Sequence, residues 1–439
     1  MSGLEDRLRR LVLEHGPIPV ARYMALALAH PGGGYYPRRD PLGAAGDFVT
    51  APEISQLFGE LIGLALVQHW LDLGRPARVA LAELGPGRGT LMADALRAAR
   101  VAPAFLAAVS VHLVETSPAL RERQAANLPG LPVRWHDELA GLPLDRPLLL
   151  VANEFLDALP IRQFVRKAGR WYERLVAVDA SGAFGFVLAT RATPFPDAVG
   201  EVRSDLPDGT LVELAPAREA LVETLALRLA AQGGLALLID YGADAAAMTG
   251  DTFQAVRRHA RVDPLVAPGE ADLSSHVDFR ALARRALAGG AAVYGPVSQA
   301  AFLGRLGIEL RLRALLERAT PAQAEALTGG CARLLGAEQM GELFRVMALA
   351  APGALVPPGF EVGEKRRGCC GPIRWRPCPA CGTPSSPARV ASARASGARS
   401  TWACAAATSR RAWPRTGAAP RRRWASRRRT SSPPARSTA

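Results

Sequence analysis

The sequence is poor in cysteine and in long apolar runs. Only one of its 6 cysteines, Cys331, lies before residue 361, so the first 360 residues cannot contain a disulfide framework. The N-terminus has no apolar segment of the kind that directs secretion. No run of about 20 apolar residues is present, which excludes a membrane-spanning helix of ordinary length. These absences predict a cytoplasmic, disulfide-free protein without membrane insertion.

Acidic residues are nearly absent from the C-terminal segment 361–439. It holds 18 of the 54 Lys and Arg but only 2 of the 40 Asp and Glu, which leaves 36 basic against 38 acidic groups in the first 360 residues. The net charge of +14 therefore belongs to this segment. Because the body has no excess of positive charge, we expect no specific nucleic-acid partner. Its hydrophobic content is ample for a packed core.

The same C-terminal segment also lacks Leu, Phe, Tyr, Met, Asp and Asn. Such a composition buries too little apolar surface to offset the entropy of ordering the chain, so 361–439 is predicted to be disordered. Cys378-Pro-Ala-Cys381 has half of a zinc-site spacing, without a second half and without a nearby histidine. We therefore predict no metal site.

The most informative stretch present is Ala82–Thr90, AELGPGRGT, which lies between an apolar run and a helical pattern. Its glycines, Gly85, Gly87 and Gly89, let the backbone turn sharply and approach a ligand closely. A dinucleotide-binding loop has the spacing G-x-G-x-x-G, whereas this loop has G-x-G-x-G. The spacing favours a ligand without a pyrophosphate, and S-adenosylmethionine is the obvious candidate.

An acidic residue follows the next predicted strand. Glu115 ends the apolar run Val109–Val114, where a carboxylate can accept hydrogen bonds from ribose hydroxyls. A helix is predicted from Pro118 to Asn127 with Ser117 as N-cap. A third strand near Val133 ends at Asp137, which either binds the exocyclic amine of a nucleoside or belongs to an ordinary turn.

A continuous apolar run at 147–152 predicts a central strand of a parallel sheet. It leads into Asn153–Pro160, NEFLDALP, at the carboxyl edge where open α/β sheets bind ligands. Glu154 and Asp157 lie three residues apart among apolar residues, and such carboxylates are costly to desolvate without a cationic partner. A guanidinium group would suit them. The alternative is that both cap a turn and face water.

A Gly- and Pro-rich segment, His30–Ser55, is too irregular for a helix or strand and long for a passive connection. Its polar residues Asp47, Thr50 and Glu53 are candidates for contact with a ligand or substrate as part of a lid. Alternatively, Thr50 or Glu53 caps the helix predicted over 54–73.

The remaining pattern predicts an α/β fold with an N-terminal helical extension (1–75) and a β insertion (161–210) inside a domain that spans 1–360. Ser275 is a plausible N-cap for a helix that ends at Leu287. Other predicted elements are helices at Leu4–His15, Val20–His30, Ala215–Ala231, Ser298–Arg318 and Pro321–Leu335, and strands at Gly234–Asp240 and Leu343–Ala350.

Together these segments resemble one family closely, the MidA-type class I methyltransferases. Its mitochondrial member is the arginine methyltransferase that assists assembly of respiratory complex I. The resemblance covers about Leu4 to Phe360. It is carried by the segments GGYY, GDFVTAPEISQLFGELIG, ELGPGRGTLMADALR, HLVETSPALRERQ, NEFLDALPIRQFV, IDYG, GDTFQAVRRH, ADLSSHVDF and MGELF.

The resemblance implies a seven-stranded, mostly parallel Rossmann-like sheet with one antiparallel strand formed late in the chain. It implies that S-adenosylmethionine is held by the glycine loop and Glu115, with Glu83 and Asp137 lining its site and with Thr90 and Asn153 beside it. Residues 153–160 would face the methyl acceptor, an arginine of a protein such as a complex I subunit homologue. The family pattern ends near Phe360, and a frameshift near residue 361 would explain the unrelated sequence that follows.

The leading hypothesis is therefore an enzyme that moves a methyl group from S-adenosylmethionine to a protein arginine, with Glu154 and Asp157 offsetting the guanidinium charge. Alternatives are a methyltransferase for small molecules, since the fold does not fix the acceptor, and an assembly factor that keeps the cofactor pocket for its shape. A nicotinamide-dependent dehydrogenase is a further alternative, against which the glycine spacing counts. The sequence carries no signature of an oligomeric state.

Overall fold

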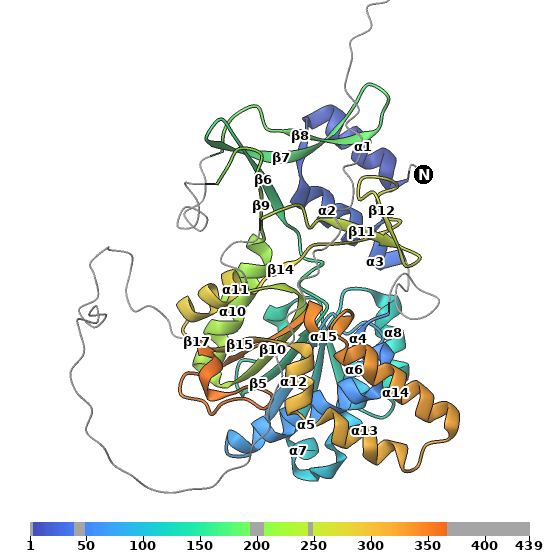
Figure 1. The fold of residues 1–439 in the computed structure, drawn as a ribbon, viewed down its shortest axis with the longest axis vertical. Coiled ribbons are helices and arrows are strands. Elements are labelled where there is room, and N and C mark those ends of the chain that lie inside the picture. The colour runs from blue at the N-terminus through green and yellow to red at the C-terminus, as the bar shows by residue number, and fades with distance from the viewer. Residues whose placement is uncertain (1–2, 39–48, 194–205, 245–248, 367–439) are drawn as a thin grey trace, which may run out of the picture. The chain divides into compact units, whose positions relative to one another are not determined.

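The computed structural model describes residues 3–38, 49–193, 206–244 and 249–366 (Figure 1). Most helices and strands expected from periodicity are present in this part of the chain, and the fold is a mixed α/β domain built on one large sheet. Asp47 and the C-terminal residues 367–439, including Cys378 and Cys381, lie outside the described residues.

The large sheet has seven main strands in the order β4-β3-β2-β5-β10-β16-β15. Among these seven strands, β16 alone runs in the direction opposite to the other six, as the family resemblance implies. Two-residue strands extend the sheet, β14 beside β10 and β17 beside β15. The strands are β2 (Val79–Leu84), β3 (Val109–Val114), β4 (Val133–His136), β5 (Leu148–Asn153), β10 (Gly234–Ala243), β14 (Val277–Asp278), β15 (Ala292–Ser298), β16 (Phe344–Ala350) and β17 (Lys365–Arg366).

Helices cover both faces of this sheet, which explains why its central strands read as continuous apolar runs. Every residue of β2 and β5 is buried. Alternate side chains of β2 belong to two separate cores: Leu81 packs with α5, α6, α12 and α14, and Ala82 packs with α10 and α11. The helices are α5 (Gln56–Asp72), α6 (Thr90–Ala98), α7 (Pro103–Ala108), α8 (Pro118–Asn127), α10 (Pro216–Gln232), α11 (Phe279–Ala288), α12 (Gln299–Arg305), α13 (Ile308–Leu316), α14 (Pro321–Leu335) and α15 (Met340–Leu343).

A second sheet joins the N-terminal extension to the β insertion. Its order is β1-β7-β6-β9, with β8 also paired to β7, and β9 lies beyond the predicted 161–210 range. A third sheet has the order β12-β11-β13. The elements of this region are α1 (Leu4–His15), β1 (Ile18–Pro19), α2 (Val20–Ala29), α3 (Tyr35–Arg38), β6 (Arg162–Lys167), β7 (Arg170–Val178), β8 (Phe184–Leu188), β9 (Leu211–Leu214), β11 (Gln254–Arg257), β12 (Ala260–Val262) and β13 (Asp272–Ser274). The short helix α4 (Ala51–Ile54) instead packs with α5, α6 and α14 of the main domain.

Helix termini show where local chemistry decides a boundary. Ser117 caps α8 as predicted, because its hydroxyl accepts a hydrogen bond from the Leu120 amide at 3.4 Å. The prediction of Ser275 as the cap of α11 is wrong, since Asp278 accepts the bond from the Ala281 amide at 2.9 Å. The long helix expected over 298–318 is divided, because Gly307 has a φ of +85° and starts α13 afresh.

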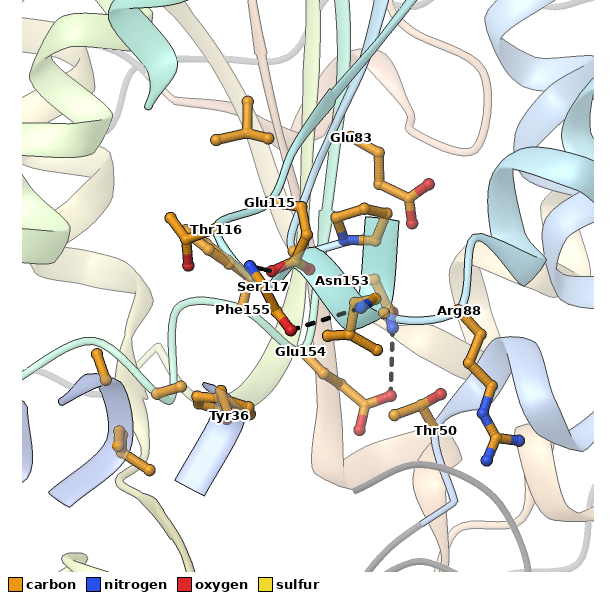
Figure 2. Close-up of a pocket in the computed structure, with 18 of the residues that line it drawn as sticks. Tyr36, Thr50, Glu83, Arg88, Glu115, Thr116, Ser117, Asn153, Glu154 and Phe155 are labelled. Atoms are coloured by element: carbon orange, nitrogen blue, oxygen red, sulfur yellow. Dashed lines mark hydrogen bonds between the residues drawn. The ribbon is translucent and has the colours of Figure 1, made fainter. Parts of the chain in front are cut away.

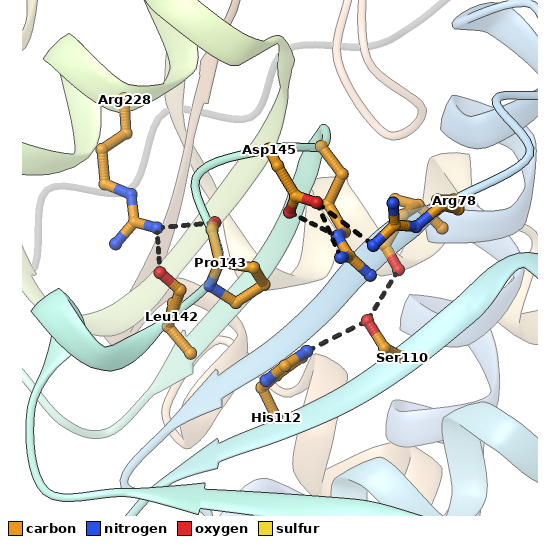
Figure 3. A network of polar contacts seen from close by, with 9 residues as sticks. Arg78, Ser110, His112, Leu142, Pro143, Asp145 and Arg228 are labelled. Carbon is orange, nitrogen blue, oxygen red and sulfur yellow. Dashed lines mark hydrogen bonds and ion pairs between the residues drawn. The ribbon is translucent and has the colours of Figure 1, made fainter.

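A polar network fixes the edge of the sheet opposite the carboxyl ends of its strands (Figure 3). The buried guanidinium of Arg228 donates to the carbonyls of Leu142 and Pro143, each at 2.9 Å, just before β5 begins. Asp145 pairs with Arg78 at 3.1 Å. These contacts connect the loop that leads into β5 with α10 and with Arg78, which precedes β2.

The fold continues past the boundary that was placed at 360 from the sequence. Arg305 forms ion pairs with Glu361 at 3.2 Å and with Glu364 at 3.0 Å. The guanidinium of Arg366 donates to the Gly295 carbonyl at 2.6 Å, beside the pairing of β17 with β15. The first six residues of the predicted tail are thus packed on the domain. Within the described ranges, no helix is both long and apolar enough to cross a membrane.

Candidate functional site

A cavity of about 400 Å³ opens at the carboxyl ends of β2, β3, β4 and β5 (Figure 2). It is lined by ten of the residues predicted from sequence: Thr50, Glu53, Glu83, Gly85, Gly87, Thr90, Glu115, Asp137, Asn153 and Glu154. Two predicted residues, Gly89 and Asp157, are not among its lining residues. The structure therefore gathers most of the predicted site at one place, although these residues come from segments up to 104 positions apart in the sequence.

The glycine loop has the conformation that its sequence requires. All three glycines have positive φ, +60° at Gly85, +53° at Gly87 and +80° at Gly89. A Cβ on Gly85 would come within 2.7 Å of the Phe155 ring, so the loop after β2 and the loop after β5 are packed against each other. Gly89 is the N-cap residue of α6. The loop is thus a preformed turn between β2 and α6.

Glu83 lies deep at one end of the cavity. Its side chain is 3% exposed, and its Oε2 atom has no hydrogen-bond partner among the described residues. Burial raises the pKa of this carboxyl to about 8. A buried carboxyl without a partner is costly in an empty protein, and a cationic group of a ligand would satisfy it.

Glu115 projects from the end of β3 and is oriented by its neighbours. One oxygen accepts from the Ser117 amide at 2.7 Å, and the other accepts from the Gln124 amide group at 3.4 Å. Gln124 is itself fixed, since it donates to the Gly87 carbonyl at 2.8 Å and accepts from the Trp135 indole at 2.8 Å. Burial raises the pKa of Glu115. Its carboxylate is therefore held in a single position toward the cavity.

Asp137 lies at the rim. Its side chain is 81% exposed and pairs with Arg121 at 2.6 Å. Arg121 also donates to the Glu115 carbonyl at 2.7 Å, so it links the ends of β3 and β4. Asp137 thus reaches the cavity but already has an ionic partner, a contact that the sequence pattern did not indicate.

The segment before α5 contacts the site, and it does so without capping that helix. Ser55 caps α5 by accepting from the Leu57 amide at 3.3 Å, so the alternative in which Thr50 or Glu53 serves as that cap is wrong. Glu53 instead accepts from the Thr90 hydroxyl at 2.5 Å and pairs with Arg88 at 3.5 Å. This carboxylate therefore ties the segment to the glycine loop.

Glu154 follows β5 with a φ of +51°, a left-handed conformation that is uncommon for glutamate and that turns the chain sharply. One carboxylate oxygen accepts from the Ala51 amide at 3.1 Å. The same oxygen accepts from the Asn153 side chain at 3.2 Å (Figure 2). Burial raises the pKa of Glu154 to about 7, and the nearby charge of Asp157 adds to the shift. The Oδ1 atom of Asn153 has no hydrogen-bond partner among the described residues.

Asp157 does not line the cavity beside Glu154, contrary to the expectation that both carboxylates face one ligand. It is 7% exposed and lies behind the cavity wall, where it is hydrogen-bonded to Tyr241 and close to the charge of Arg218. The reason is local: the left-handed turn at Glu154 and the following irregular residues direct the two side chains differently, although they are three apart in sequence.

Two buried charges that the sequence did not single out hold this loop. Asp240 accepts from the Leu156 amide at 2.9 Å and from the Asp157 amide at 3.1 Å. Arg218 donates to the Asp157 carbonyl at 2.9 Å and to the Ser275 hydroxyl at 2.6 Å. Both are almost completely buried. The position of Asp240 at the end of a predicted strand was a usable signal, whereas nothing in the sequence distinguishes Arg218 from other arginines.

Comparison with known proteins places this geometry in a family. Residues 61–297 match the model of a family of S-adenosyl-L-methionine-dependent methyltransferases. The chain is 41% identical over 382 residues to the mitochondrial protein arginine methyltransferase NDUFAF7 of Mus musculus, with 81% of this chain and 85% of the relative covered. It is 39% identical to the protein of the same name from Homo sapiens, with 76% and 80% covered.

A solved structure agrees in fold. A protein from Burkholderia thailandensis bound to S-adenosyl-homocysteine is 31% identical and superimposes with a TM-score of 0.71, covering 83% of this chain and 95% of that one. The names of the mouse and human relatives place those proteins in mitochondria, which conflicts with the cytoplasmic location expected from the sequence and overturns it. By sequence, fold and site geometry, the chain belongs to the family of S-adenosyl-L-methionine-dependent methyltransferases that includes the NDUFAF7 proteins.

Proposed function

We propose that this protein methylates arginine side chains of a protein substrate. The observation that carries the proposal is the position of Glu154, a carboxylate at the carboxyl end of β5 inside the same cavity as the glycine loop. The name of the relatives, protein arginine methyltransferase, supports the choice of acceptor. The resemblance to the family whose mitochondrial member assists complex I assembly favours a complex I subunit homologue as the substrate.

The residues that line the cavity fit the cofactor. S-adenosylmethionine carries a cationic amino-acid end, a ribose and an electrophilic methyl group on a sulfonium. Glu83 would hold the ammonium group, since its Oε2 atom has no partner in the described part of the chain, and Glu115 would accept from the ribose hydroxyls. Asn153 would complete the site through its Oδ1 atom, which also has no partner within the described ranges. The backbone of the glycine loop would lie along the ligand, with Thr90 fixed beside it by Glu53.

In this proposal the carboxylate charge of Glu154 recognises the acceptor guanidinium in a part of the cavity that is shielded from water. Glu154 is half-buried, and its ionised form would pair with a guanidinium and fix the direction of the acceptor nitrogen. Asp157 acts from behind the wall. Its negative charge raises the pKa of Glu154, and it does not touch the acceptor. The two carboxylates therefore have different roles in this proposal. The simpler expectation from the sequence was that both would contact the acceptor guanidinium.

Charge deletion at the two positions tests the proposal. Glu154→Gln and Asp157→Asn preserve size and remove charge. We expect Glu154→Gln to lower methyl transfer by roughly thirty-fold to several-thousand-fold, the kinetic equivalent of about 2–5 kcal/mol for one truncated partner of a desolvated charge pair. Asp157→Asn should retain methyl transfer. The acidic limb of its pH–rate profile should move to lower pH, because the pKa of Glu154 falls when the neighbouring charge is removed.

Labelled methyl incorporation into host-lysate protein, followed by amino-acid analysis for methylarginine, is measured for each variant over pH 5 to 9. Cofactor affinity is measured by calorimetry and should change little in either. Wild-type transfer by Glu154→Gln would refute the role of this carboxylate. A methylated product other than arginine would refute the choice of acceptor.

A further inference from the structure

One wall of the cavity is apolar and comes from elements outside the cofactor loop. Its residues are Ala25, Leu28 and Ala29 of α2 and Ala158, Leu159 and Pro160 after β5. Such a wall removes water from a side chain that passes along it, which strengthens any charge interaction further inside. Within this region Tyr36 of α3 also lines the cavity.

The Tyr36 side chain is fixed from two directions. Its hydroxyl donates to Asp272 of β13 at 2.9 Å. The ring of Tyr35, which is completely buried, packs edge-on against it with the ring centroids 5.3 Å apart. Burial and the nearby charge of Asp272 raise the pKa of Tyr36 well above its usual value, so the phenol stays protonated. Because the hydroxyl is engaged with Asp272, the aromatic ring is what Tyr36 contributes to the cavity.

Tyr36 and Glu154 line the same cavity. Burial raises the pKa of both groups, and the nearby charge of Asp157 adds to each shift. Figure 2 shows the Tyr36 ring at one side of the cavity and Thr50 at the other, with the Glu154 carboxylate between them in this view. The cavity thus combines an aromatic ring, a carboxylate and an apolar wall.

We propose that Tyr36 is an acceptor-binding residue that selects guanidinium over ammonium. This inference rests on the proposed function. A guanidinium is planar and weakly hydrated, so it can stack on an aromatic ring while its N–H groups donate to a carboxylate. An ammonium is a compact, strongly hydrated charge that gains less from the same surroundings. Tyr36 therefore supplies the part of the specificity that Glu154, which attracts any cation, does not supply.

The test uses two small probes, Nα-acetylarginine methylamide and Nα-acetyllysine methylamide, titrated by NMR into the full chain saturated with S-adenosylhomocysteine. Tyr36→Phe keeps the ring and removes the bond to Asp272. Tyr36→Leu removes the ring. We expect the wild type and Tyr36→Phe to prefer the arginine probe, and Tyr36→Leu to lose about 2- to 30-fold of its affinity for that probe with little change for the lysine probe.

Cofactor affinity and melting temperature are measured in parallel, and Tyr36→Leu should match Tyr36→Phe in both. An unchanged probe preference in Tyr36→Leu, or no binding of the arginine probe by the wild type, would overturn the inference. A loss of S-adenosylhomocysteine affinity in Tyr36→Leu would place the ring in the cofactor site instead.

The two proposals fail separately. If methylarginine forms in lysate protein and Tyr36→Leu still prefers the arginine probe over the lysine probe as the wild type does, only the role of Tyr36 is refuted. If the preference for the arginine probe depends on Tyr36 but no methylarginine forms in the lysate assay, the proposed methyl transfer to arginine is refuted. The role of Tyr36 in a guanidinium-binding site then remains.

Discussion

Glu83 gives a prediction in which stability and binding change in opposite directions. The side chain is 3% exposed and its Oε2 atom has no partner among the described residues, and burial raises its pKa from 4.5 to about 8. Glu83→Gln keeps the shape of the side chain and removes the ionisable group. We expect the variant without cofactor to be more stable than the wild type at alkaline pH, and to bind S-adenosylmethionine more weakly.

The sign follows from proton linkage. Because the pKa is higher in the folded state, the folded protein binds the proton more tightly than the unfolded chain. The wild type therefore loses stability as pH rises from the unfolded value of 4.5 through the folded value of about 8. The shift of about 3.5 units at about 1.4 kcal/mol per unit amounts to at most about 5 kcal/mol, all of it lost by pH 9. Glutamine does not titrate, so this contribution is missing in the variant.

The assay is urea unfolding of both proteins at pH 5, 7 and 9 without cofactor, with calorimetric titration of cofactor at pH 7. The difference in free energy of unfolding between variant and wild type should grow by a few kcal/mol from pH 5 to pH 9. If that difference is independent of pH, Glu83 does not titrate in this range and the argument from its burial fails. If affinity is unchanged, its carboxylate does not face the ligand.

Two further predictions concern the cofactor site and the end of the domain. Glu115→Ala should weaken cofactor binding by about 1–3 kcal/mol, roughly 5- to 150-fold in Kd by calorimetry, because it removes charge-assisted bonds to the ribose; unchanged affinity would exclude that role. A chain that ends at Arg366 should keep the melting temperature of the full chain, since the deleted residues 367–439 have little apolar surface to bury. A chain that ends at Phe360 should melt at a lower temperature, because it also loses the partners of Arg305 and the pairing of β17 with β15. Equal melting of the two truncated chains would show that residues 361–366 contribute nothing to stability.

The order of elements and the gathering of most predicted cofactor residues at one edge of the sheet were predictable because both depend on local patterns. Mostly apolar segments of six residues mark β2 and β3, and a glycine loop and an acidic residue follow them directly. In a parallel sheet these strand ends must meet at one edge. The Ser117 cap was readable for the same reason, since donor and acceptor lie three residues apart.

The direction of a side chain in an irregular loop was not predictable. Glu154 and Asp157 share a loop, but the left-handed φ of Glu154 is imposed by the loop's packing and leaves no mark in the sequence of a non-glycine residue. Arg218 and Asp272 act through partners far away in the chain, so their roles depend on the tertiary fold. Tyr36 was not among the residues predicted for the site, and its place in the cavity likewise depends on the tertiary fold.

The loop after β5 is held by two residues, Asp240 and Arg218, that lie far along the chain from it. The strands β2 to β5, which carry the cofactor residues, emerge from the ribosome within one continuous stretch, 79–153. The amide of Leu156 finds its acceptor only when Asp240 has been made, 84 residues later, and the Asp157 carbonyl finds Arg218 after 61 residues. The loop that carries Glu154 can therefore be held in this way only in a chain that extends to Asp240. On the proposed function, the acceptor side of the site depends on contacts of long sequence separation, whereas the predicted cofactor residues 83–153 lie close together in sequence.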